Sequence, residues 1–200
     1  MADTYPNFAA LDLAEKQSGT FSITAQDRGS SVVIAAPHGG AIEPGTSEIA
    51  RAIAADDLSY YSFEGRKRDG NAALHITSSN FDEPQCLKLL LPAETVLTVH
   101  GEASEYEVVY LGGRDKLTLE RIRQSLAEQS LTVCTHANPE LQGIHPRNIC
   151  NVGFSGAGVQ LEISLGLRRT FFTSLNRSGR QNPTPRLAKF AAAIRGALLK

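Results

Sequence analysis

Short apolar segments alternate along this chain with longer segments of helical period, and this alternation constrains the fold most. Thr95 to Val99 is β-branched and apolar, as in a strand buried on both faces. Lys116 to Gln129 is amphipathic, because its apolar positions share one helical face and its charges lie opposite. We therefore expect an α/β fold with a mixed, largely parallel sheet flanked by helices.

About seven or eight strands and about four or five helices are expected. The expected strands are Phe21 to Thr24, Ser31 to Ala36, Ser59 to Phe63, Ala73 to Thr77, Thr95 to Val99, Glu107 to Leu111, Leu131 to Thr135 and Val159 to Ser164. The clearest expected helices run from Thr46 or Ser47, as the cap, to Ala54, from Asp82 to Leu91, from Lys116 to Gln129 and from Pro185 to Leu199. No repeat or linker-like tract divides them, so a single domain is expected over residues 1–200.

Composition excludes several classes of protein. The formal net charge of −1 argues against a nucleic-acid or membrane-surface binder. Three cysteines without a CxxC pair argue against a disulfide framework and a thiolate zinc site. Neither a secretory signal nor an apolar stretch long enough to span a bilayer is visible. We therefore expect a cytoplasmic monomer that binds neither nucleic acid nor membranes.

The most informative segment joins a buried strand to a histidine, a glycine pair and a glutamate. It runs Val32-Val-Ile-Ala-Ala-Pro-His38-Gly-Gly-Ala-Ile-Glu43. Ligand sites in open α/β sheets lie just beyond the carboxyl ends of strands, which is where His38 stands. The two glycines allow the tight turn that lets the imidazole and the carboxylate converge.

A second buried strand also ends in a histidine followed by glycine, at His100-Gly101. Two histidines and one carboxylate, with a fourth position left for water, form a common catalytic zinc set. Nitrogen and oxygen donors suit zinc without thiolates. We therefore predict a Zn²⁺ site made of His38, Glu43 and His100. The alternative, in which each histidine is a hydrogen-bonded structural residue, stays open because His100 lies far along the chain.

An acidic residue on a later strand is the candidate general base. Gly156-Ala-Gly-Val-Gln-Leu-Glu162-Ile-Ser164 alternates apolar and polar residues after a glycine-rich loop. A strand glutamate that faces a metal cleft can take a proton from zinc-bound water and pass it to the leaving amine. The alternative for Glu162 is a solvated acid on an edge strand.

Together these motifs resemble the poly-γ-glutamate hydrolases of bacteriophage type, whose bacterial relatives are often labelled phage-related replication proteins. The likeness rests on His38-Gly-Gly-Ala-Ile-Glu43-Pro-Gly-Thr46, Val99-His100-Gly101 and Gly158-Val-Gln-Leu-Glu162, and covers nearly the whole chain. It implies a compact zinc-carboxypeptidase-like fold, zinc held by His38, Glu43 and His100, and Glu162 as general base and acid. Four residues separate His38 from Glu43, whereas larger zinc carboxypeptidases have two between the metal His and Glu, which weakens any transfer of exopeptidase specificity.

A poly-γ-glutamate site also needs side chains that bind the carboxylates of the substrate. The polymer carries a free α-carboxylate on every unit, and the planar fork of arginine matches a carboxylate. The candidates near the predicted centre are Arg147, Asn148, Asn151, Arg168 and His75. His75 would line the cleft or support a metal ligand. For each arginine, a solvated surface charge is the alternative.

The leading functional hypothesis is endo-acting hydrolysis of γ-glutamyl amide bonds by attack of zinc-bound water, on an anionic polymer or peptide substrate. A second hypothesis is a zinc amidase for cell-wall peptides, short γ-glutamyl peptides or N-acyl amino acids, since fold does not determine substrate. A third is a non-catalytic binding protein on the same fold. Release by phage-induced lysis would also bring a cytoplasmic enzyme to an extracellular polymer.

Overall fold

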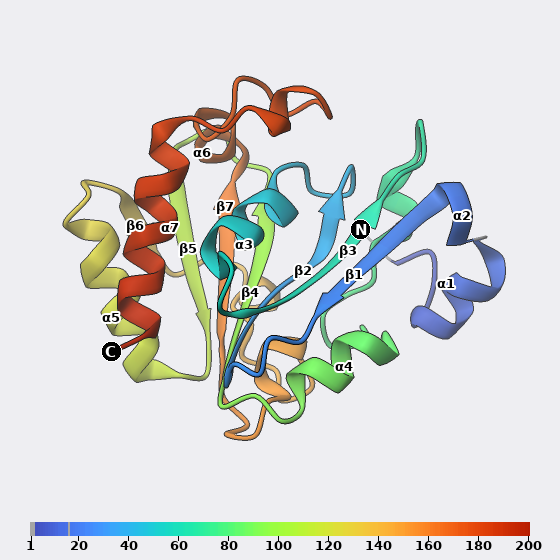
Figure 1. Cartoon of the computed structure of the whole chain (residues 1–200), viewed down its shortest axis with the longest axis horizontal. Helices are drawn as coiled ribbons and strands as arrows, with labels where there is room; N and C mark the ends of the chain where they lie inside the picture. Colours follow the sequence, from blue (N-terminus) through green and yellow to red (C-terminus); the bar gives the residue numbers. More distant parts are fainter. Residues whose placement is uncertain (1–2, 16) are drawn as a thin grey trace.

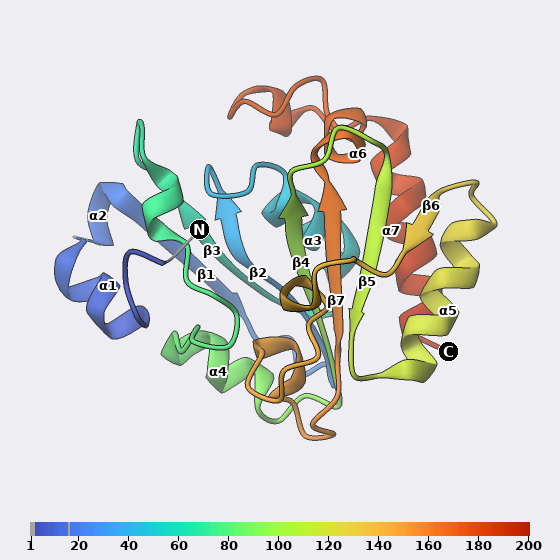
Figure 2. The same cartoon turned by 180° about the vertical axis from the view of Figure 1, so that it is seen from behind.

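The computed structural model describes residues 3–15 and 17–200, and a seven-stranded sheet forms its centre (Figures 1 and 2). The strands are β1 (Phe21–Gln26), β2 (Val32–Gly40), β3 (Ser59–Gly65), β4 (Thr95–Glu102), β5 (Val108–Gly113), β6 (Thr132–Cys134) and β7 (Val159–Ser164), in the order β1-β3-β2-β4-β7-β5-β6. The pairs β2–β3, β2–β4, β4–β7 and β5–β6 are parallel, while β1–β3 and β5–β7 are antiparallel. The predicted α/β class with a mixed, mostly parallel sheet is confirmed.

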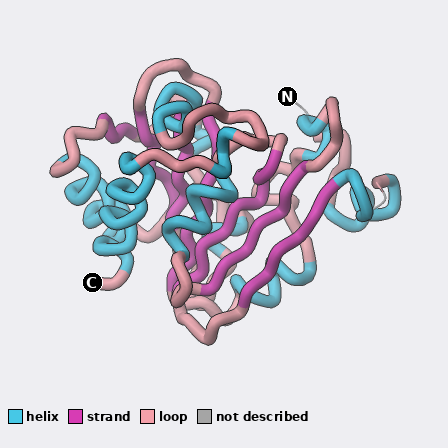
Figure 3. Tube along the Cα trace, turned by 45° about the horizontal axis from the view of Figure 1, so that its top comes forward, coloured by secondary structure: helices cyan, strands magenta, loops and turns pink. Residues whose placement is uncertain are grey.

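Helices lie on both sides of this sheet (Figure 3). They are α1 (Phe8–Ala14), α2 (Gln17–Thr20), α3 (Thr46–Ala54), α4 (Pro84–Leu90), α5 (Lys116–Ala127), α6 (Leu165–Thr170) and α7 (Pro185–Leu198), with short 3₁₀ turns at η1 (Asn71–Leu74), η2 (Pro139–Leu141), η3 (Ile149–Asn151) and η4 (Gly179–Gln181). Buried side chains of α3, α5 and α7 form one core with the sheet, and those of α1 and α4 form a second core on the opposite face. No helix in the described residues is both long and apolar enough to cross a membrane.

Alternation along the central strands separates an apolar face from a polar one. In β7, Val159, Leu161 and Ile163 enter the core beneath α3, α5 and α7. The intervening side chains therefore point to the opposite face, because successive strand residues alternate. On β4 and β7 these are Thr98, His100, Gln160, Glu162 and Ser164, all buried and polar. A row of buried polar groups on one sheet face indicates a site there, because such groups need partners.

One expected strand, Ala73 to Thr77, is not a strand. Residues Asn71–Leu74 form η1 after Gly70, whose φ of 75° is left-handed. His75 is extended, and residues 75–77 belong to no helix or strand. Side chains satisfy their backbone instead, since Ile76 O contacts His38 Nε2 and Thr77 N donates to Asp3 Oδ2. The segment is thus held against the sheet by polar side chains.

A further expectation needs correction. Neither Thr46 nor Ser47 caps α3, because the N-cap is Gly45 with a φ of 100° and no side-chain cap. Three short helices, α1, α2 and α6, were not expected. The described part of the chain therefore has seven α-helices, more than the four or five predicted.

Candidate functional site

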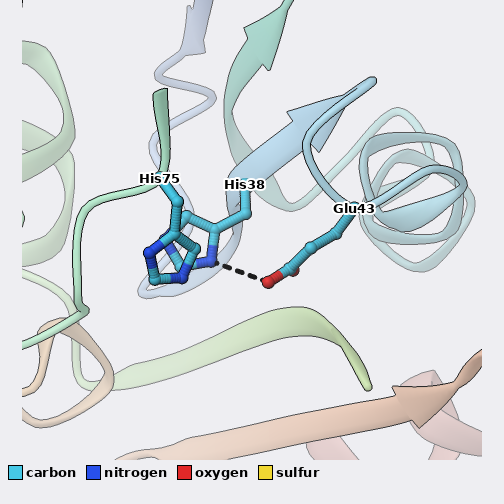
Figure 4. A group of neighbouring side chains, drawn as sticks. All are labelled: His38, Glu43 and His75. Atoms are coloured by element: carbon cyan, nitrogen blue, oxygen red, sulfur yellow. Dashed lines mark ion pairs between the residues drawn. The ribbon is translucent and has the colours of Figure 1, made fainter. Parts of the chain in front are cut away.

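His38 is turned toward the polar face at the end of β2. The register of β2 against β3 shifts between Ala36 and Gly39, so the strand is irregular where this histidine stands. His38 Nε2 lies 2.8 Å from Ile76 O, and a carbonyl only accepts, so Nε2 carries the hydrogen. The lone pair is therefore on Nδ1, which lies 3.2 Å from Glu43 Oε1 (Figure 4). Burial alone would lower the pKa of His38, but the adjacent Glu43 carboxylate raises it overall.

Glu43 is brought back to the strand end by a tight turn. Its backbone N–H donates to His38 O at 2.9 Å, and Gly40 within the turn has a φ of 67°. The Glu43 Oε2 atom accepts from Gly101 N at 2.8 Å, which ties the turn after β2 to the end of β4. Burial would raise the pKa of Glu43, but the charges of His38 and His100 and these hydrogen bonds lower it to about 2.

His100 completes a converging set of ligand atoms. Its Nδ1 lies 3.1 Å from His38 Nδ1 and 4.0 Å from Glu43 Oε2, while its Nε2 lies 3.5 Å from Ser78 Oγ. Burial and the charge of His38 lower the pKa of His100 to about 3, which favours a neutral ring. Two facing imidazole nitrogens repel unless a proton or a cation lies between them. Two nitrogens and a carboxylate around one point are the donor set of a catalytic zinc, so these residues fit the ion.

His75 offers a second way to complete the centre. Its ring stacks on that of His38, with centroids 4.0 Å apart and an interplanar angle of 33°. One ligand atom from each of His38, Glu43 and His75 lies within 4.8 Å of the others (Figure 4). The His75 Nδ1 atom lies 2.8 Å from Asp3 Oδ1, a carboxylate–histidine pair of the kind that supports metal ligands. Sequence reasoning missed Asp3, because no local pattern links residues 72 positions apart.

Glu162 lies beside His100, on the neighbouring strand β7. It pairs with His100 in the parallel register of β4 and β7, and it is 5% exposed. Burial raises the pKa of Glu162 well above its usual range, and the charges of Glu43 and Glu102 raise it further. A carboxyl of raised pKa beside a metal-ligand set is a candidate general base and acid.

The loop before β7 carries three of the residues predicted to bind substrate. Arg147 is exposed, and its guanidinium makes no hydrogen bond or ion pair within the described residues. Asn148 is buried and donates to Gln160 Oε1 at 2.8 Å. Asn151 is also buried, and its Nδ2 donates to Gly143 O at 2.7 Å. The two asparagine side chains thus hold the loop, whereas Arg147 is free to meet a ligand.

Arg168 connects the turn after β2 with the ends of β4 and β7. It is 4% exposed, and its Nε donates to Ile163 O at 3.0 Å. Its Nη1 donates to Pro44 O at 2.6 Å and its Nη2 to Glu102 O at 3.0 Å. Pro44 follows Glu43 in the turn after β2, Glu102 ends β4, and Ile163 lies in β7. The guanidinium therefore ties these three segments together beside the site.

We expect Arg168→Lys to lower the free energy of unfolding by about 1–3 kcal/mol, because an ammonium cannot replace the planar fork on three carbonyls. Urea unfolding with excess chelator measures this without a contribution from metal. The matched control is Arg169→Lys at the next position, where the arginine is 55% exposed and pairs with Glu105. That change should cost less than about 0.5 kcal/mol. Equal losses in the two variants would contradict the role of Arg168.

Comparison with known proteins gives consistent matches. A family model described as poly-γ-glutamate hydrolase matches residues 5–193. The YndL protein of Bacillus subtilis (strain 168) is 37% identical over 171 residues, which are 85% of this chain and 67% of YndL. A structure of YndL described as apo and zinc-free has a TM-score of 0.93 at 34% identity, covering 100% of this chain and 98% of that one.

The structure of a bacteriophage poly-γ-glutamate hydrolase has a TM-score of 0.94 at 33% identity, covering 99% of this chain and 97% of that one. A more remote likeness, to an N-formylglutamate amidohydrolase from Ralstonia eutropha, has a TM-score of 0.51 at 11% identity and covers 90% of this chain and 96% of that one. The likeness to the amidohydrolase concerns the fold alone, and it agrees with the single α/β domain and mixed, largely parallel sheet expected from the sequence.

Proposed function

Because this chain belongs to the poly-γ-glutamate hydrolase family, we propose that it is a zinc-dependent, endo-acting hydrolase of γ-glutamyl amide bonds in poly-γ-glutamate. The observation that carries the proposal is the convergence of His38 Nδ1, His100 Nδ1 and the Glu43 carboxylate beside Glu162. A related protein described as zinc-free in its apo form supports zinc as the ion.

The roles of the residues follow from their contacts. Zinc at this point would supply a Lewis acid that lowers the pKa of water and polarises the scissile carbonyl. The hydrogen bond from His38 Nε2 to Ile76 O keeps the His38 Nδ1 lone pair aimed at the centre. Glu162 accepts the proton of the attacking water and returns it to the leaving nitrogen, a role suited to a carboxyl of raised pKa.

Substrate charge would be met by Arg147. Its exposed guanidinium stands on the loop whose next residue, Asn148, is bonded to the strand that carries Glu162. An α-carboxylate of the polymer can therefore pair with Arg147 while the neighbouring γ-amide lies at the site. We propose that Asn148, Asn151 and Arg168 support this arrangement by holding loops, and that His75 lines the centre beside His38.

The proposal is tested by the size of the products formed from poly-γ-glutamate. With one zinc per chain, the enzyme should convert the long polymer to intermediate fragments, and excess chelator should stop the reaction until zinc is restored. Poly-α-glutamate, with the same charge and a different linkage, is the matched control and should stay intact. Release of single glutamates without intermediate sizes would exclude endo action. Cleavage of short γ-glutamyl peptides or N-acyl amino acids alone would assign the amidase alternative.

A further inference from the structure

A directional chain of hydrogen bonds leads from the loop before β7 to Glu162. The backbone N–H of Cys150 donates to Asn148 Oδ1 at 3.0 Å. The Asn148 Nδ2 atom then donates to Gln160 Oε1 at 2.8 Å. Gln160 Nε2 donates in turn to Glu162 Oε1 at 2.9 Å. All three hydrogen bonds join buried groups, so water does not compete for them.

Contacts with the backbone determine the orientation of the two side-chain amides, Asn148 and Gln160, in this hydrogen-bonded series. A backbone N–H can only donate, so Cys150 requires the oxygen of Asn148 on its side. A carbonyl can only accept, and Leu141 O lies 3.1 Å from Gln160 Nε2, so the NH₂ group of Gln160 faces it. The second hydrogen of this NH₂ group goes to Glu162. Neither amide can flip without losing a bond to the backbone.

We propose that Gln160 is a positioning residue for the general base: it keeps Glu162 Oε1 as a hydrogen-bond acceptor, so that Oε2 is the oxygen that takes up and releases the proton. This inference rests on the proposed role of Glu162. The Oε2 atom makes no hydrogen bond within the described residues and is not among the fully buried polar atoms that lack a partner. Oε2 is therefore the oxygen left for water or substrate.

Close packing holds Gln160 in this position. Its side chain is 2% exposed, and the loop backbone at Gly143 lies directly against it. A Cβ at Gly143 would come within 2.9 Å of Gln160 Cβ and 3.0 Å of its Oε1, and the Gly143 φ of 62° also favours glycine. The loop can therefore approach the amide only with glycine at this point. This packing and the three hydrogen bonds of its amide restrict the conformation of Gln160, so that its Nε2 stays directed at Glu162 Oε1.

The test compares Gln160→Met, which keeps the length of the side chain and removes its donors, with the isosteric Gln160→Glu. Gln160→Met should lower kcat about 10- to 100-fold, the range typical of lost supporting hydrogen bonds, with KM within about 2-fold and zinc content unchanged. Gln160→Glu should lower kcat at least as far, because one carboxyl proton cannot serve both Leu141 O and Glu162. The matched control is Gln142→Met in the same loop. Within the residues that the structure describes, the Gln142 side-chain amide donates to His136 O and has no bond to Gln160 or Glu162, so this variant should leave kcat unchanged.

A double variant separates failure of this inference from failure of the proposed function. In the Glu162→Gln background, Gln160→Met should cause no further loss of kcat, because its effect acts through Glu162. Full kcat in folded Gln160→Met and Gln160→Glu, with Glu162→Gln inactive, would overturn the positioning role and leave the general base in place. Activity in Glu162→Gln itself would instead overturn the proposed function. A kcat loss in Gln142→Met equal to that in Gln160→Met would assign the effect to the loop and also overturn the inference.

Discussion

Glu162→Gln is expected to lower kcat for poly-γ-glutamate by about 10²- to 10⁴-fold, the range that general acid–base catalysis contributes. The amide has the same shape, so the hydrogen bond from Gln160 Nε2 can be kept, but an amide takes up no proton at pH 7. The three proposed zinc ligands are unchanged, and the zinc content should stay at about one per chain. Single-turnover kinetics and metal analysis on the same sample measure the two quantities together.

An acid outside the site provides the control for this experiment. Glu105 is exposed in the loop between β4 and β5, where it pairs with Arg169. Glu105→Gln makes the same chemical change and should leave both kcat and zinc content unchanged. A Glu162→Gln variant that keeps zinc and hydrolyses the polymer at the wild-type rate would exclude Glu162 as the general base.

The sheet and its strand ends could be predicted because their patterns are local. Val159 to Ser164 alternates strictly, and β7 has those same bounds in the structure. Thr95 to Val99 lies within β4, although the strand continues to Glu102 through His100. A histidine at the end of a buried apolar segment is visible in sequence because burial and β-propensity act over a few residues. Helix α3, by contrast, begins after a left-handed glycine, a conformation that residue type alone does not show.

The parts of the site that sequence could not supply depend on long-range contacts. The apolar pattern around His75 predicts a strand because Leu74 and Ile76 are buried in the core on this face of the sheet. Their segment is held there by the side chains of Asp3 and His38 rather than by strand pairing. The role of Gln160 depends on Leu141 and Asn148 approaching from the loop. Polar groups in a buried network depend on partners distant in sequence, so the local motif predicts Glu162 as a candidate but does not predict its hydrogen-bond partners.

His38→Ala and His100→Ala are each expected to abolish zinc binding, whereas His75→Ala should keep zinc with about 10- to 100-fold lower affinity. The ligand lone pair of an imidazole lies in the plane of its ring. The rings of His38 and His100 are tilted by 66°, so their facing Nδ1 lone pairs can converge on one ion. The ring of His75 lies at 33° to that of His38, and its Nδ1 atom contacts the Asp3 carboxylate, an arrangement that suits a supporting residue. Metal content after dialysis, followed by competition with a chromophoric chelator, measures both outcomes.

The four variants together decide which histidine completes the centre. His136→Ala is the control, because His136 packs on Tyr110 and should leave zinc content unchanged. Loss of zinc in His75→Ala, with zinc retained in His100→Ala, would assign His75 as the third zinc ligand in place of His100. Asp3 would then be the carboxylate that orients this ligand. Loss in both would indicate a site with three histidines and Glu43, in which less room remains for water. Retention in His38→Ala would contradict every arrangement considered, because His38 contacts both other histidines and Glu43.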